Sequence, residues 1–381
     1  MTSLANSFIV ARDTGCEVAH DTGCEGLGPH GDEMTVHNKV ESLQALRFVA
    51  ALIVVLFHAH LSVMATGAAP ALFGLFANGE LGVDIFFVIS GFVIYVSATR
   101  RPDFSAAGFL FDRFWRIYPI YWVVLSAQFA SEALSLATGL GNVRPEAFET
   151  GPIAASLLLL PVTKSWMVLD VAWTLTLEVT FYLIFALSYV RGGHRAALIC
   201  VSAWFLAGGL WRGLAGSTEA PLLLANEKVL EFAFGLIVAR LFVQGRMPYA
   251  RLALGVGALG LAGVLFALPY PAFRAAPQWL VAGLPAACLV YGLAARPVTM
   301  PRWLLLAGEA SYSLYLIHFL LIGLIASVSQ KLLGVHPMAS LFTGLPVIAA
   351  LILSSIALTV WVERPILRWG RRRRRRPAAV S

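Results

Sequence analysis

The sequence predicts an all-α, polytopic integral membrane protein with about ten transmembrane helices. Hydrophobic residues make up 59% of its 381 residues and charged residues only 13%, and the mean hydropathy is +0.77. The charge that coats a soluble globule is therefore missing. Apolar runs near 20 residues recur from Leu43 to the end of the chain. Each is long enough to cross a hydrocarbon core about 30 Å thick.

Short clusters of Arg, Pro or Gly separate these runs and mark the ends of the expected helices. We expect one membrane domain, residues 39–368, between a disordered polar extension of residues 1–38 and a basic tail of residues 369–381. The expected helices span residues 43–64, 80–98, 118–137, 171–190, 196–213, 226–243, 252–268, 279–295, 309–328 and 341–362.

Lysine and arginine residues between the helices predict the orientation. With the N-terminus inside, nineteen of them lie on inner connections and in the C-terminal segment, and six lie on outer connections. Both termini are therefore expected in the cytoplasm. The same distribution explains the net charge of +7 without nucleic-acid binding. The arginine run near the C-terminus is typical of a segment that binds anionic lipid.

The polar extension repeats DTGCE at residues 13–17 and 21–25. No apolar stretch precedes it, so it is not expected to be a cleavable signal. Its two cysteines have no histidine pair at ligand spacing, so we predict no metal site there. Cys200 and Cys288 fall in predicted helices and are expected to be ordinary small apolar residues.

The first predicted helix carries Arg47 and His58 within LQALRFVAALIVVLFHAH. At about 1.5 Å and 100° per residue, eleven steps put them on nearly one helix face, roughly 16 Å apart. A titratable side chain in hydrocarbon costs about 3 kcal/mol, so such groups normally face a cavity or a partner. This cost indicates a functional role for both residues.

The second predicted helix, ELGVDIFFVISGFVIYV, has Asp84 near its outer end and Ser90 and Gly91 at mid-depth. Small residues let another helix or a ligand approach closely. Helix packing alone explains the Ser90–Gly91 pair equally well. Asp84 either belongs to a site or only caps its helix and balances the helix dipole.

The inner segment GFLFDRFWRIYPIYW mixes aromatic and charged residues. We expect it to lie as an amphipathic segment in the membrane interface and to end at Pro119, where the third helix enters the bilayer. Arg113 and Arg116 then share one face. Two adjacent guanidinium groups suit a phosphate or pyrophosphate, although contact with lipid headgroups accounts for the same spacing.

The fourth predicted helix contains DVAWTLTLEVTFYLIF, with Glu178 toward the outer side. A carboxylate at this depth needs a cation, a hydrogen-bond donor or a proton. Thr174 and Tyr182 flank it at i−4 and i+4 and are placed to supply hydroxyl groups. A buried glutamate neutralised by Arg or Tyr is the structural alternative.

The ninth predicted helix, in EASYSLYLIHFLLIG, carries Ser311, Tyr315 and His318 on one polar stripe. A hydrogen-bonded core histidine is the alternative to a functional one. In the closing VERPILRW we expect Glu363 and Arg364 to pair at the inner rim.

Depth divides these residues into two zones. Three arginines, Arg47, Arg113 and Arg116, are expected near the cytoplasmic side, where they form a phosphate-binding zone. His58, Glu178 and Asp84 are expected toward the outside, where they form an acid/base zone. Much of the bilayer is expected to separate the two zones.

Six segments of the chain, taken in order, resemble acyltransferase family 3, a family of membrane proteins that O-acylate carbohydrates and some secondary metabolites. These segments are RFVAALIVVLFH, GVDIFFVISGF, FDRFWRIYPIYW, WTLTLEVTFY, SYSLYLIH and VERP. The similarity runs from Leu43 to Pro365. It implies a ten-helix core and transfer of an acyl group, commonly acetyl, from cytoplasmic acyl-CoA to a hydroxyl on the outer face. The repeated DTGCE is no part of the family pattern.

The resemblance also implies roles for particular residues. His58 is expected to be the general base, with Glu178 or another carboxylate orienting its imidazole, and a covalent acyl-histidine is an open alternative. Arg47, Arg113 and Arg116 are expected to hold the phosphates of acyl-CoA. The expected supporting residues are Asp84, Ser90, Trp173, Tyr182, Ser311, Tyr315 and His318.

The expected donor is acetyl-CoA and the expected partners are a carbohydrate or glycosylated acceptor and the lipid bilayer, with no metal and no nucleic acid. The expected location is a bacterial inner membrane. The sequence does not indicate which acceptor is used or whether the chain oligomerises. A proton-coupled transporter would use the same intramembrane His, Glu and Arg, although no half-to-half repeat supports one. A sensor or scaffold that works through the basic tail is a further alternative.

Overall fold

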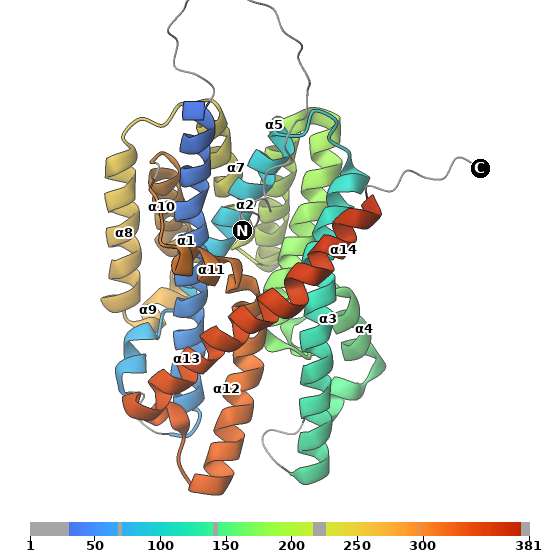
Figure 1. Cartoon of the computed structure of the whole chain (residues 1–381), viewed down its shortest axis with the longest axis vertical. Coiled ribbons are helices and arrows are strands. Elements are labelled where there is room, and N and C mark those ends of the chain that lie inside the picture. The colour runs from blue at the N-terminus through green and yellow to red at the C-terminus, as the bar shows by residue number, and fades with distance from the viewer. Residues whose placement is uncertain (1–29, 68–70, 140–143, 216–225, 297, 375–381) are drawn as a thin grey trace, which may run out of the picture.

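The computed structural model describes residues 30–67, 71–139, 144–215, 226–296 and 298–374. Every regular element in these ranges is helical, and the helices lie side by side in one bundle (Figure 1). The long helices are α1 (His30–Met64), α2 (Leu81–Thr99), α3 (Ala106–Thr138), α5 (Trp173–Ala215), α7 (Val229–Val243), α8 (Ala250–Phe266), α10 (Leu284–Ala294), α12 (Ser311–Leu333) and α13 (Leu341–Leu358).

Shorter elements connect or extend them. These shorter elements are η1 (Ala71–Phe76), η2 (Pro145–Phe148), α4 (Thr150–Leu158), η3 (Lys164–Trp166), η4 (Asp170–Ala172), α9 (Tyr270–Ala275), η5 (Trp279–Gly283), α11 (Arg302–Glu309), η6 (Pro337–Ala339), η7 (Thr359–Glu363) and α14 (Arg364–Arg374). Among them, η5 and η7 are single π-helical turns; η5 leads into α10, and η7 follows α13.

Each of the ten predicted ranges coincides with helical structure. By length and apolar composition, six described helices qualify as membrane spans, and α8 and the η5–α10 segment are shorter apolar helices. The all-helical membrane fold is therefore confirmed, whereas the count of ten crossings stays a prediction. Residues 1–29, with the repeated DTGCE, lie outside the described residues, and α1 already begins within the predicted extension.

Glycines hold α2 and α7 close together. A Cβ atom on Gly91 would collide with the Phe232 carbonyl, and one on Gly235 would collide with the Val88 carbonyl. Small residues of this kind let two membrane helices approach to backbone contact. Gly91 therefore packs against a helix, and the neighbouring Ser90 faces a different direction, into the pocket described below.

Helix α3 corrects one expectation. The segment around Arg113 does not lie apart as an interfacial element, because α3 begins at Ala106 and passes through Pro119 without ending. The Ser105 hydroxyl caps its first turn by accepting a hydrogen bond from the Gly108 amide. The helix thus starts twelve residues before the predicted residue 118 and carries its arginines into the bundle.

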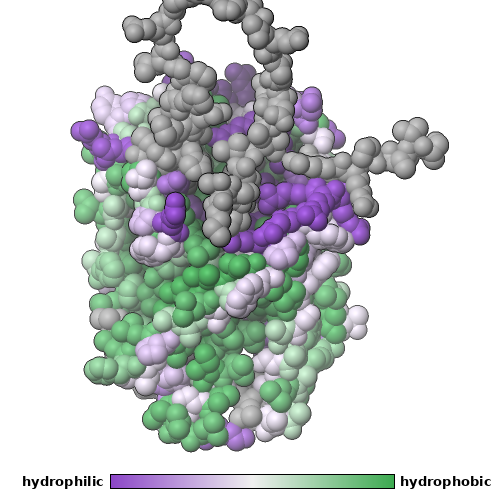
Figure 2. Space-filling model, in the orientation of Figure 1, coloured by the Kyte–Doolittle hydropathy of each residue, from purple (hydrophilic) through white to green (hydrophobic). Residues whose placement is uncertain are grey.

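The chain from α13 through η7 to α14 forms one diagonal rod across the bundle, and α14 lies against α3 (Figure 1). Figure 2 shows the hydrophilic residues of this face gathered over α14 and the upper end, above a hydrophobic surface. The basic tail predicted at residues 369–381 is helical as far as Arg374. The start of α3 and the arginines of α14 therefore share one end of the molecule.

Candidate active site

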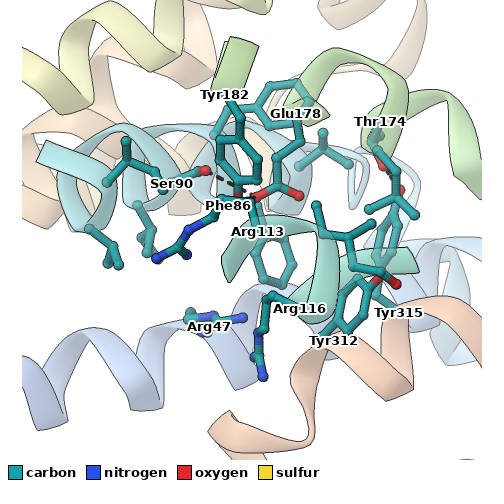
Figure 3. Close-up of a pocket in the computed structure, with 17 residues that line it drawn as sticks. Arg47, Phe86, Ser90, Arg113, Arg116, Thr174, Glu178, Tyr182, Tyr312 and Tyr315 are labelled. Carbon is teal, nitrogen blue, oxygen red and sulfur yellow. Dashed lines mark hydrogen bonds between the residues drawn. The ribbon is translucent and has the colours of Figure 1, made fainter. Parts of the chain in front are cut away.

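A pocket of about 110 Å³ lies within the bundle among α1, α2, α3, α5 and α12 (Figure 3). Its wall is mainly apolar, with a few polar groups that converge on one space. It is lined by Arg47, Val83, Phe86, Phe87, Ile89, Ser90, Val93, Ile94, Arg113, Arg116, Ile117, Thr174, Leu175, Glu178, Tyr182, Tyr312 and Tyr315. A concave, mostly apolar site with few convergent polar groups is typical of a ligand or active site.

The three predicted arginines meet at this pocket, but their partners differ. Arg116 donates to the Glu363 carboxylate at 2.5 Å and lies over the Tyr312 ring, 5.8 Å from its centroid. Arg113 lies over the rings of Phe109 and Tyr182 at 5.3 and 5.8 Å. Its buried Nε atom has no hydrogen-bond partner among the described residues.

Arg47 reaches the same space from α1, as Figure 3 shows. It lies within electrostatic range of Glu178 and Arg116. The charge of Arg116 is already balanced by a buried carboxylate, since Glu363 is only 2% exposed. Arg47 and Arg113 are consequently the cations best placed to meet an anionic ligand.

Glu178 lies among these arginines rather than in a separate outer zone. Its Oε1 atom accepts hydrogen bonds from the Ser90 hydroxyl at 3.0 Å and the Tyr182 hydroxyl at 2.5 Å. The expectation that much of the bilayer separates Glu178 from the arginines is therefore wrong. The reason is the early start of α3, which places Arg113 beside Tyr182 at mid-bundle.

His58 lies outside the pocket and contacts a second imidazole. Its Nδ1 atom is 3.2 Å from Nε2 of His318 and 3.0 Å from the Val54 carbonyl oxygen. The rings of Phe57 and Phe319 pack edge-on against it at 5.1 and 5.5 Å. His58 is partly exposed, whereas His318 is fully buried.

Tyr315 connects the pocket to the imidazole pair, and Phe86 packs beside it. Phe86 and Tyr315 both line the pocket, and their ring centroids are 6.0 Å apart. The Tyr315 ring is also 5.7 Å from the His318 ring, and its hydroxyl shares a 2.7 Å hydrogen bond with the Thr174 hydroxyl. The pocket and the imidazole pair are thus separated by little more than one aromatic layer.

Three other predicted supporting residues lie away from the pocket wall. Ser311 is buried and donates to the Gly308 carbonyl at 2.7 Å, so it stabilises the start of α12. Trp173 begins α5, and the Lys164 ammonium is 5.8 Å from its ring centroid. Asp84 belongs to a separate cluster described next.

Asp84 forms a buried ion pair that the sequence did not reveal. The Lys228 Nζ atom donates to both Asp84 oxygens, at 2.7 and 2.6 Å. The two residues are 0% and 5% exposed, and the fully buried Glu231 lies within electrostatic range of both. From the sequence, Lys228 counts as an ordinary loop cation, and nothing in its spacing points to Asp84.

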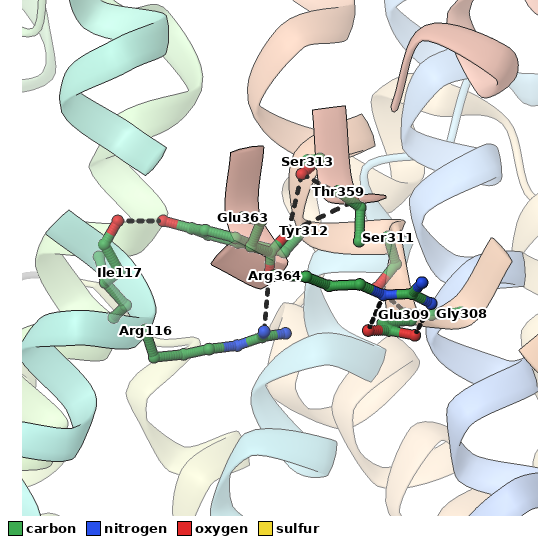
Figure 4. A network of polar contacts seen from close by, with 10 residues as sticks. All are labelled: Arg116, Ile117, Gly308, Glu309, Ser311, Tyr312, Ser313, Thr359, Glu363 and Arg364. Atoms are coloured by element: carbon green, nitrogen blue, oxygen red, sulfur yellow. Dashed lines mark hydrogen bonds and ion pairs between the residues drawn. The ribbon is translucent and has the colours of Figure 1, made fainter. Parts of the chain in front are cut away.

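A polar network joins α3, α11, α12 and the α13–α14 rod (Figure 4). Glu363 accepts from Arg116 and, through its other oxygen, from Ser313 at 2.9 Å. Arg364 instead forms a bidentate ion pair with Glu309, in which Nε donates to Oε1 at 2.9 Å and Nη2 donates to Oε2 at 2.7 Å. The predicted Glu363–Arg364 pair is therefore wrong, because consecutive residues on a helix point in different directions.

In the part of the chain that the structure describes, no group of three or more His, Cys, Asp or Glu side chains has the arrangement of a metal site. Two groups of side chains are candidates for the chemistry. One is the basic pocket with its Glu178–Tyr182 pair, and the other is the pair of imidazoles.

A basic pocket beside paired imidazoles, inside an apolar helical bundle, is typical of a functional site in a membrane protein. The chain belongs to acyltransferase family 3, because residues 40–364 match the family model described as an acyltransferase domain. It is thus an acyltransferase of the kind that transfers groups other than amino-acyl groups. Membership of this family favours an enzyme over the transporter and scaffold alternatives.

Three relatives are similar along most of their length. The exopolysaccharide production protein ExoZ of Rhizobium meliloti is 32% identical over 310 residues, 78% of this chain and 93% of ExoZ. The putative membrane-bound transacylase BcsY of Komagataeibacter xylinus is 28% identical, over 86% of this chain and 83% of BcsY. The acyltransferase MdmB of Streptomyces mycarofaciens is 28% identical, over 88% and 94%. No solved structure matches the chain.

Proposed function

We propose that this protein moves an acetyl group from cytoplasmic acetyl-CoA to a hydroxyl of a carbohydrate at the outer face of a bacterial inner membrane. The observation that carries the proposal is the placement of a basic pocket one aromatic layer from a partly exposed histidine. The arginines suit the phosphates of the donor. The histidine suits general-base catalysis on the acceptor.

The charge distribution supports this direction of transfer. The α14 arginines lie at the end of the molecule where α3 starts (Figure 1), and arginine-rich ends favour the cytoplasm. Arg47 is nearer that end of α1 than His58 is. At the opposite end, Lys164 and Glu80 lie within electrostatic range of His58. The donor therefore enters on the arginine side, and the acceptor approaches His58 from the other side.

The reaction follows from these positions. A nitrogen of His58 removes the proton of the acceptor hydroxyl, and the oxygen attacks the thioester carbonyl carbon. The new C–O bond forms as the C–S bond breaks, and the leaving thiolate of coenzyme A takes up a proton. Glu178 balances the pocket arginines and is held by Ser90 and Tyr182. To reach His58, the acyl end of the donor passes Phe86 and Tyr315.

Donor binding is expected to depend on Arg113 more cleanly than on Arg116. Arg113→Ala should weaken acetyl-CoA binding about 10- to 100-fold, since a hydrogen bond to a charged group contributes about 1.5–3 kcal/mol. Arg116→Ala should mainly lower thermal stability, because it removes the cation that balances the buried Glu363 carboxylate. Binding of radiolabelled acetyl-CoA to the protein in nanodiscs measures the first effect.

The matched control is Arg101→Ala in the segment just before α3. Arg101 pairs with Asp112 at the surface, so its loss should leave acetyl-CoA binding unchanged. Unchanged binding in the Arg113→Ala and Arg113→Ala/Arg116→Ala variants would refute the donor assignment.

The path from the arginine pocket to His58 favours a short acyl group. It passes the Phe86 and Tyr315 rings, whose centroids are 6.0 Å apart. Phe86→Ala should raise the use of butyryl-CoA relative to acetyl-CoA about tenfold, because methylene-sized differences in a pocket are worth about 1–3 kcal/mol. Competition between the two donors measures this ratio. An unchanged ratio, with Phe129→Ala outside the pocket as control, would contradict the assignment.

The carbohydrate acceptor is supported by one relative whose name refers to exopolysaccharide production. Its test is the acyl content of surface polysaccharide from cells with and without this protein. We expect ester-linked acetyl groups to disappear from one polysaccharide when the protein is absent. Equal acetyl content in every surface glycan would reject the carbohydrate acceptor.

A further inference from the structure

Each imidazole of the His58–His318 pair faces a backbone carbonyl one helical turn earlier. His58 Nδ1 lies 3.0 Å from the Val54 oxygen, and His318 Nδ1 lies 3.1 Å from the Leu314 oxygen. His318 Nε2 in turn lies 3.2 Å from His58 Nδ1. Three hydrogen-bonding contacts therefore involve three of the four ring nitrogens.

These contacts admit one arrangement of protons for two neutral rings. A carbonyl oxygen only accepts, so each Nδ1 atom must carry the proton that it donates. His318 Nε2 is then a lone pair, and it accepts from His58 Nδ1. A cationic His318 is disfavoured, because the residue is 0% exposed and its ring neighbours are His58 and Tyr315.

We infer that His318 is a positioning residue that, together with the Val54 carbonyl, holds His58 in the Nδ1–H tautomer. The Nε2 atom of His58 is then free to take the proton from the hydroxyl of the acyl acceptor. This inference rests on the proposed function, in which His58 is the base. It assigns to an imidazole the task that a carboxylate performs in other triads, where a third group orients the base. Glu178, which sequence reasoning proposed for this task, has its Oε1 atom bound to Ser90 and Tyr182.

The same contacts stabilise the protonated, cationic form of His58. When Nε2 takes up a proton, Nδ1–H still has two acceptors, the Val54 carbonyl and the His318 lone pair. The positive charge is thereby shared with buried acceptors among the apolar rings of Phe57 and Phe319. Without His318, only the carbonyl of the same helix remains to hold the ring.

The test reads the tautomer directly. In protein labelled with ¹⁵N-histidine and held in nanodiscs, the His58 signals are assigned as those missing from the His58→Gln variant. We expect the Nδ1–H tautomer in wild type and in His318→Gln, whose amide oxygen also accepts a hydrogen bond. In His318→Leu the Val54 carbonyl is the one acceptor left from this group, so we expect a measurable share of the Nε2–H tautomer beside the Nδ1–H form. This readout does not depend on activity, so it is separate from the test of the proposed function.

Kinetics supply the second readout. His318→Leu should lower kcat by about 10- to 100-fold, the effect of losing the partner that orients a metal-bound imidazole, with little change in KM for acetyl-CoA. His318→Gln should retain most of the activity. His318→Met replaces the leucine variant if that variant does not insert. An unchanged His58 tautomer in the apolar variant, or equal loss of kcat in the glutamine and apolar variants, would overturn the inference.

Discussion

Replacing His58 with alanine is expected to lower acyl transfer by about 10²- to 10⁴-fold, the usual contribution of a general base. Binding of acetyl-CoA should be unchanged, because His58 does not line the arginine pocket. The loss should therefore appear in kcat rather than in donor affinity. Transfer of radiolabel from acetyl-CoA to extracted polysaccharide, measured on purified protein in proteoliposomes, tests this.

His60→Ala is the matched control. His60 lies two residues further along α1 and is not part of the imidazole pair. Its loss should leave turnover close to that of wild type. Transfer by His58→Ala at a rate near wild type, in protein that inserts and binds acetyl-CoA, would mean that the base is another group.

Breaking the Asp84–Lys228 pair is expected to destabilise the fold by about 3–5 kcal/mol, because one charge is left buried without its partner. Asp84→Leu or Lys228→Met should each lower the thermal unfolding midpoint in detergent by several degrees. The double variant should recover much of this loss, since it removes both buried charges. Each single variant and the double variant form a thermodynamic cycle that isolates the pair.

The exposed ion pair between Arg274 and Glu80 is the control. The Arg274 side chain is 52% exposed, and exposed pairs contribute only about 0–1 kcal/mol. Arg274→Ala should therefore leave the unfolding midpoint nearly unchanged. Single variants at Asp84 or Lys228 that unfold like wild type would show that the buried pair does not stabilise the contact between α2 and α7.

Hydropathy was sufficient to place the ten predicted helical ranges, because each apolar run must cross or line the same bundle, but it did not predict short helices such as α4 and α9. It also predicted the break after residue 190, where α5 is interrupted by non-helical backbone at Gly192 and Gly193. It failed at the start of α3. There the amphipathic pattern and Pro119 suggested a separate element, but membrane helices tolerate proline when neighbouring helices support them.

The candidate site residues could be picked out from the sequence because polar groups are costly in hydrocarbon. Helical spacing correctly predicted Tyr182 as a partner of Glu178, whereas Thr174 bonds to Tyr315. Partners on other helices could not be predicted, because those contacts join distant parts of the chain. His318 and His58 are 260 residues apart, and Arg116 and Glu363 are 247 apart. Helical spacing places residues on a face, but it does not say which faces meet.

The most direct measurement follows the acyl group across the membrane. Inverted vesicles, which expose the cytoplasmic face, are prepared from cells that make either the wild-type protein or the His58→Ala variant. These vesicles are loaded with polysaccharide taken from cells that lack the protein. Labelled acetyl-CoA is then added outside. We predict that label reaches the enclosed polysaccharide only with wild-type protein, and that right-side-out vesicles transfer none from external donor. Equal labelling with His58→Ala, or transfer from donor outside right-side-out vesicles, would contradict the account.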